Sequence, residues 1–198
     1  MEAQIERIRC GLVVLLAGCF LTGCFAPKSY VAPEFRHATY ENLEPKTEPL
    51  AVLVDVMFQV NGKDKPAVVA QVRPKVSRIL RASRVVSDHA ALASAPRLSL
   101  VINNIGDLSD ARAKGVAAGL TFGAAGVAVS DFYEMTASFT TPEGVSTKKL
   151  YKHAIHSTIG AHAAPKGVEL VPPETAFERV LEDMLLNFLV DLQKEKVL

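Results

Sequence analysis

Residues 131–159 read DFYEMTASFTTPEGVSTKKLYKHAIHSTI, and this stretch decides the fold. Alternate residues of its first half are large or apolar, which is the two-residue period of a strand with one buried face. The residues expected on that face are Tyr133, Met135, Ala137 and Phe139. Pro142-Glu143-Gly144 then supplies a turn. The pattern predicts a β-hairpin with strands at about 131–141 and 145–159.

A long helix is expected to follow, beginning near Pro173, because proline is favoured at the first helical position. Its apolar residues recur at three- and four-residue spacing and would form one buried stripe. They are Phe177, Val180, Leu181, Met184, Leu185, Phe188, Leu189 and Leu192. Charged residues fall opposite this stripe: Glu178, Arg179, Glu182, Asp183 and Asp191. We expect the neighbouring carboxylates Glu182 and Asp183 to be solvated.

Upstream of the hairpin, Leu50–Val60 is almost entirely apolar and predicts a strand covered on both faces. Residues 66–83 carry apolar side chains at helical spacing, and Pro74 inside them is expected to kink or split that helix. Residues 84–87 and 98–102 predict two further strands.

A helical turn is expected at 88–94. The order is then β-α-β-(short α)-β-β-β-α. This order predicts an α/β (α+β) domain over residues 49–198, with a single mixed sheet of about five strands and two main helices packed on it.

An uncharged, glycine-rich stretch interrupts this order as an insertion at about 107–130. Residues 115–129 read GVAAGLTFGAAGVAV, with Gly115, Gly119 and Gly123 four residues apart and Phe122 among them. On a helix these glycines would form a smooth stripe that permits close backbone contact. Two interpretations are open: a segment that touches a membrane or self-associates, and a helix or hairpin buried against the sheet.

The N-terminal region carries an apolar run from Cys10 to Gly23 after Arg7 and Arg9. A membrane-spanning helix needs about 20 apolar residues, whereas the core of a signal peptide needs only about 7–15. The run closes with Leu21-Thr22-Gly23-Cys24. An earlier Cys19, in Leu16-Ala17-Gly18-Cys19, also fits the pattern. An uncleaved anchor or a buried helix is the alternative.

This segment resembles the signal of bacterial lipoproteins, whose lipobox ends in a cysteine. The resemblance implies a signal peptide at 1–23, cleavage before Cys24 (or Cys19) and lipid on that cysteine. Phe25 stands where an Asp retains enterobacterial lipoproteins in the inner membrane, which implies the outer membrane with the domain facing the periplasm. Residues 24–48 would then be a lipidated tether, interrupted by Pro27, Pro33 and Pro45.

The order of elements over 49–196 resembles the small domain shared by the amino-terminal part of TolB, the curli-secretion lipoprotein and lipoprotein activators of peptidoglycan synthases. The glycine-rich stretch before Asp131–Met135 is similar to that of a subset of proteobacterial lipoproteins. The resemblance implies binding or assembly work in the cell envelope without catalysis, through an envelope protein partner or self-association. The alternative is an oligomerising or membrane-inserting component of a secretion or transport assembly that acts through residues 115–129.

Composition narrows the function further. The formal net charge of +1 gives no support for nucleic-acid binding. Of the three cysteines only Cys24 would remain after cleavage, and lipidation would consume it, so no disulfide is expected. The sequence contains neither a Gly-x-Ser-x-Gly nucleophile motif nor a phosphate-binding glycine loop. We therefore expect no enzyme activity and no cofactor.

Two other groups of residues are candidate sites. His153, His156 and His162 suggest metal ligands, but residues 153 and 156 of one strand point to opposite faces, so no metal site is expected and the histidines should be exposed. A basic run lies around the first helix, and it would contact anionic lipid or glycan, or else form a solvated face balanced by neighbours such as Asp88. Its members are Arg73, Lys75, Arg78, Arg81 and Arg84.

Overall fold

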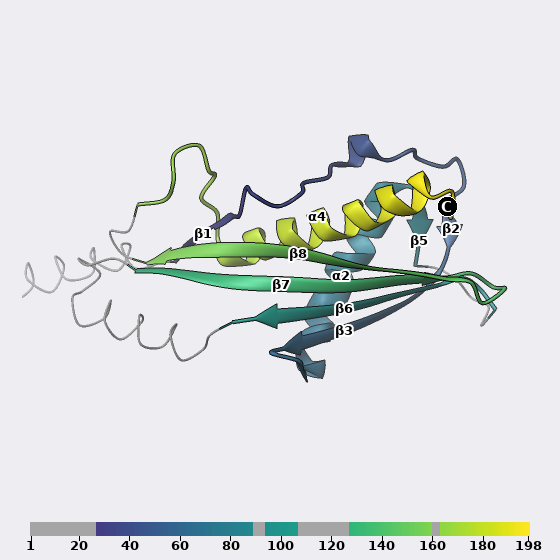
Figure 1. Ribbon diagram of the computed structural model, residues 1–198, viewed down its shortest axis with the longest axis horizontal. Helices are drawn as coiled ribbons and strands as arrows, with labels where there is room; N and C mark the ends of the chain where they lie inside the picture. The colour runs from purple at the N-terminus through teal and green to yellow at the C-terminus, as the bar shows by residue number, and fades with distance from the viewer. Residues whose placement is uncertain (1–26, 89–93, 107–126, 160–162) are drawn as a thin grey trace, which may run out of the picture.

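The computed structural model describes residues 27–88, 94–106, 127–159 and 163–198 of the chain (Figure 1). The strands are β1 (Lys28–Val31), β2 (Leu50–Ala51), β3 (Leu53–Val60), β4 (Lys63–Asp64), β5 (Val86–Ser87), β6 (Arg97–Ile105), β7 (Val127–Thr140) and β8 (Ser146–Ile159). The helices are the 3₁₀ turn η2 (Tyr40–Asn42), α2 (Pro66–Ser83) and α4 (Pro173–Lys194).

The main sheet has six strands in the order β1-β8-β7-β6-β3-β4. β3 and β6 are parallel, and the other neighbouring pairs are antiparallel. The helix α2 makes the crossover between β3 and β6, as parallel neighbours require. The predicted class, a mixed sheet with two main helices, is confirmed. The sheet has one strand more than expected, and β2 and β5 form a small parallel pair of their own.

The predicted hairpin is confirmed, and its strands β7 and β8 pair over their whole lengths, from Val127–Ile159 to Thr140–Ser146. The helices cover one face of the sheet (Figure 1). Between that face and the helices lies the core, in which the side chains of Met135, Leu185 and Phe188 are fully buried. The predicted stripe of α4 is confirmed except at Phe177, which is only partly buried.

The single strand expected at Leu50–Val60 was wrong, and of the two outcomes expected at Pro74, a kink or a split, the split does not occur. Leu50–Val60 is not one strand covered on both faces: β2 and β3 belong to different sheets, and Asp55 and Met57 of β3 are exposed. Pro74 does not split α2, which runs unbroken from Pro66 to Ser83. Pro74 lies on the exposed side of the helix, where water can satisfy the carbonyl that loses its partner. The expected helical turn at 88–94 falls mostly on residues 89–93, outside the described residues.

The prediction of a tether at 24–48 is wrong for residues 28–48. β1 extends the sheet by pairing with β8, from Lys28–Thr158 to Val31–Ile155. The following residues, 32–48, run beside α4 as a strap (Figure 1). The strap buries Ala32, Ala38 and Leu43. The proline-containing stretch therefore packs against the domain, with β1 and the short turn η2 as its regular structure.

Several polar contacts hold the strap against α4. The side-chain amide of Asn187, which is buried, donates to the carbonyl oxygen of Arg36 at 2.8 Å. The Arg36 guanidinium lies 3.0 Å from an oxygen of Asp191, whose other oxygen accepts from Tyr151 of β8. Farther along, the Gln193 side chain bonds both the amide and the carbonyl of Glu44, at 3.0 and 2.7 Å.

Several of the described segments begin or end at the same end of the sheet. Lys28 begins β1 beside Thr158, and Val127 begins β7 beside Ile159. Gly106 follows Ile105, which pairs with Phe132 toward the same end. Of the helices in the described ranges, none has the length and apolar character needed to span a bilayer.

Candidate functional site

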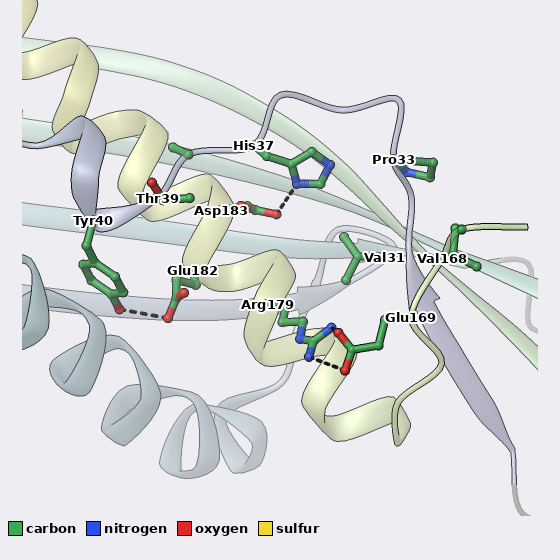
Figure 2. A pocket seen from close by; sticks show the side chains of 12 residues that line it. Val31, Pro33, His37, Thr39, Tyr40, Val168, Glu169, Arg179, Glu182 and Asp183 are labelled. Atoms are coloured by element: carbon green, nitrogen blue, oxygen red, sulfur yellow. Dashed lines mark hydrogen bonds and ion pairs between the residues drawn. The ribbon is translucent and has the colours of Figure 1, made fainter.

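A cleft of about 560 Å³ opens between the strap, the loop before α4 and the first turns of α4 (Figure 2). From the strap side it is lined by Val31, Pro33, His37, Ala38, Thr39 and Tyr40. Gly167, Val168 and Glu169 line it from the loop, and Arg179, Glu182 and Asp183 from α4. Six of these side chains are ionisable, which makes this cleft the candidate site among the described residues.

Asp183 stands at the centre of one cluster in the cleft. Its Oδ2 lies 2.7 Å from Nδ1 of His37 and 3.2 Å from Nε2 of His153. The three residues come from α4, the strap and β8. Their ligand atoms all lie within 4.8 Å of one another, so the cluster has the donor set of a metal site.

His153 is held by its surroundings. Its side chain is only 1% exposed. The backbone N–H of Ala154 donates to His153 Nδ1 at 3.0 Å, which places the proton of a neutral ring on Nε2, facing Asp183. The rings of Phe35 and His37 pack against it at centroid distances of 5.1 and 5.5 Å.

Tyr40 and Glu182 form the second polar pair of the cleft. The Tyr40 hydroxyl donates to Glu182 Oε2 at 2.8 Å, as Figure 2 shows. Burial, the hydrogen bond to Glu182 and the charge of Glu182 raise the pKa of Tyr40 well above its usual range. The hydroxyl therefore stays protonated at neutral pH, and its hydrogen bond fixes the orientation of the Glu182 carboxylate.

The third pair is the two-pronged contact between Arg179 and Glu169, with N–O distances of 2.9 and 3.0 Å (Figure 2). The hydrogen bonds and the charge of Arg179 lower the pKa of the Glu169 carboxyl. The cleft holds three carboxylates, Glu169, Glu182 and Asp183, against one guanidinium. That guanidinium, of Arg179, is paired with Glu169 and also attracts Glu182. The cleft therefore favours a cation over an anion.

Several sequence expectations need correction here. His153 is buried, not exposed, because its strand position faces the helices. Glu182 and Asp183 are not simply solvated, since the strap covers them and supplies their partners, Tyr40 and His37. Reasoning from spacing missed His37 because that residue lies 146 positions from Asp183, in a stretch interpreted as a tether.

His153 and His156 do not share a site, as expected from their spacing. His156 Nδ1 lies 2.8 Å from the hydroxyl of Ser130, on the other side of the sheet from Asp183. His162 lies outside the described residues, as do the other predicted site residues: Cys19, Cys24, Gly115, Gly119, Phe122 and Gly123.

The basic run around α2 is partly balanced by carboxylates of α4, in addition to the expected neighbours such as Asp88. Lys75 and Arg78 both pair with Glu178, and the Arg73 guanidinium donates to the carbonyl oxygen of Val54 at 2.8 Å. The hydrogen bond from Lys75 lowers the pKa of Glu178 despite partial burial. This face therefore joins the two helices.

Comparison with known proteins gives no further assignment: no protein-family model matches the chain, and no significant match is found among curated proteins.

Proposed function

We propose that this protein is a lipoprotein of the outer membrane, anchored through Cys24, whose periplasmic domain is a non-catalytic binding or assembly factor of the cell envelope. The anchor rests on the pattern Leu21-Thr22-Gly23-Cys24. The binding role rests on one structural observation, the exposed apolar side chains on the face of the sheet opposite the helices.

These side chains come from four neighbouring strands. Met57 of β3, Ile105 of β6, Phe132 of β7 and Leu150 of β8 are between 37% and 52% exposed. Met57 pairs with Val101, Val101 with Thr136, and Thr136 with Leu150, so that one row of mostly apolar residues crosses the sheet. Exposed apolar groups arranged together mark interaction sites more often than isolated ones do.

Charged residues flank this row on the same face. On one side Arg97 pairs with Asp55, and on the other Lys152 lies 2.8 Å from Glu134. This second pair separates the row from Ile105 and Phe132, which pair with each other farther along the sheet. An apolar centre with a polar rim is the usual anatomy of a protein–protein interface. A protein partner suits this face better than a small molecule, because the described clefts lie on the helical side of the domain.

The position of β1 bears on how such a domain would be presented. Lys28 lies four positions after Cys24, a distance of at most about 14 Å along an extended chain. A lipid on Cys24 would hold the domain close to the membrane. The part of the sheet nearest the membrane would be the end where β7 begins and β8 ends. The proposal therefore requires a partner that can be reached near the membrane surface, not one at the far end of a long tether.

A crosslinking pull-down from intact cells tests this function. We expect the wild-type chain to capture a distinct envelope protein, and Met57→Glu or Leu150→Glu to abolish that capture by placing a charge in the apolar row. Val145→Glu is the matched control, because Val145 is exposed in the hairpin turn, outside the row. Capture that survives both sheet-face variants in folded protein would refute the assignment of this surface.

A further inference from the structure

We infer that His37, His153 and Asp183 form a binding site for a divalent transition-metal ion, with zinc as the best fit, and that the ion fastens the strap to the domain. The inference goes beyond the proposed binding role and does not depend on it. Each residue offers one ligand atom: Nδ1 of His37, Nε2 of His153 and Oδ2 of Asp183.

The donor set suits zinc, which takes imidazole nitrogen and carboxylate oxygen at about 2.0–2.2 Å. Ligand atoms in a tetrahedral arrangement at such bond lengths lie roughly 3.3 Å apart. The two distances to Asp183 Oδ2 are 2.7 and 3.2 Å, and no pair in the cluster exceeds 4.8 Å. Small side-chain adjustments would therefore bring all three atoms onto one ion.

The protons of the two rings can be accounted for. Without an ion, each histidine directs an N–H at Asp183, and His153 Nδ1 accepts from the N–H of Ala154. With an ion, the ligating nitrogens need their lone pairs, so each neutral ring carries its proton on the other nitrogen. For His153 that nitrogen is Nδ1, which must then give up the bond from the Ala154 N–H at 3.0 Å and turn toward the carbonyl oxygen of Ala154 at 3.4 Å. A backbone carbonyl is an acceptor of the kind that orients metal-binding histidines.

The surroundings favour a cation at this position. Three carboxylates line the cleft against the one guanidinium of Arg179, which is paired with Glu169 and also attracts Glu182. Tyr40 holds the Glu182 carboxylate in place, so that its charge is fixed near the cluster. Burial on one side strengthens the attraction, because charge is less screened there than in water.

Access to the cluster differs between its members. The side chains of His153 and Asp183 are 1% and 14% exposed, whereas that of His37 is 44% exposed and lines the cleft. The cleft can therefore admit the ion and leave a fourth position open to water, the coordination that three protein ligands give. Because the ligands come from the strap, β8 and α4, a bound ion would add a further link among three elements that hydrogen bonds, ion pairs and packing already join.

Zinc titration of the untagged full-length protein, purified in detergent and freed of metal with chelator, tests the site. Calorimetry should give one ion per chain, and cobalt in place of zinc should show the visible absorption of a tetrahedral site. His37→Ala and Asp183→Asn should each weaken the affinity at least about tenfold. His156→Ala is the matched control and should bind as the wild type does.

The same samples give a second readout. Zinc should raise the melting temperature of the wild type and of His156→Ala, but not that of His37→Ala. Because His37 is half exposed, its replacement leaves the core intact, and circular dichroism of the metal-free variant checks this. Absence of binding to the wild type, or equal binding by His37→Ala, would overturn the proposal.

Discussion

The hydroxyl of Thr158 donates to the carbonyl oxygen of Lys28 at 3.3 Å, across 130 positions of sequence. This contact lies where β1 joins the edge of β8. Two hydrogen bonds between the backbones of Ser29 and Val171, each of 2.8 Å, continue the attachment on the other side of β1. The segment just after the proposed lipid anchor is therefore part of the folded domain.

Truncation at two points separates a strap from a tether. A chain that begins at residue 27 should retain the stability of the full domain, whereas one that begins at residue 49 should lose at least about 3 kcal/mol, because it gives up the buried Leu43 and Ala38 and the edge strand. Urea unfolding followed by circular dichroism measures this. Equal midpoints for the two chains would mean that residues 28–48 contribute nothing to the fold.

Asn187→Ala should loosen the strap without disturbing the sheet. The variant removes the amide that donates to the carbonyl oxygens of Arg36 and Asp183 at 2.8 and 2.9 Å, a loss of about 1–3 kcal/mol. Trypsin should then cleave after Arg36 several-fold faster. Gln71→Ala, on the exposed side of α2, is the control and should keep the wild-type rate. An unchanged rate in Asn187→Ala would show that this amide does not hold the strap.

Asp191 should make stability depend on pH. Burial alone would raise the pKa of its carboxyl, but hydrogen bonds from Tyr151 and Arg36 and the charges of Arg36 and Lys149 lower that pKa below its usual range. The unfolded chain then binds the proton more readily, so this stabilisation is present above about pH 4 and is lost as the pH falls through the folded pKa.

The variant Asp191→Asn measures that contribution. It should be less stable than the wild type by about 1 kcal/mol at pH 7, and the difference should shrink as the pH is lowered below about 4. Urea unfolding at pH 7 and pH 3 gives both values. A difference of the same size at both pH values would contradict the assignment of Asp191.

The core should depend strongly on Phe188 of α4. Its side chain is fully buried, and its ring lies edge-on to that of Tyr151 with centroids 6.1 Å apart. Phe188→Ala should cost about 3–5 kcal/mol, since it leaves a cavity between α4 and the sheet. Chemical denaturation would show this, and a loss below about 1 kcal/mol would mean that α4 packs elsewhere.

The hairpin and the terminal helix could be predicted because their apolar periods are local. β7, β8 and α4 each repeat the pattern over many residues, so a single polar exception does not hide it. β1 could not be predicted in this way. Four residues, Lys28–Val31, carry too little pattern, and what makes them a strand is the unpaired edge of β8.

The cluster around Asp183 could not be predicted for a related reason. His37, His153 and Asp183 come together only because the strap returns along α4, and nothing in the spacing of the three residues signals that path. Periodicity even suggested the opposite for Asp183, because charged residues at helical spacing usually face water. The strap did offer one signal in its sequence. His37 and Tyr40 are side chains able to bind polar groups, in a stretch that a simple tether would not need them in.

The mass of the mature N-terminal peptide tests whether Cys24 carries a lipid anchor. Protein isolated from cell membranes and digested should yield a peptide that begins at Cys24 and carries the mass of a diacylglyceryl group with or without a third acyl chain. A peptide that begins at Cys19 would move the anchor five residues away but keep the class of protein. An intact N-terminus from Met1, or a Cys24 without lipid in protein isolated from membranes, would contradict the account.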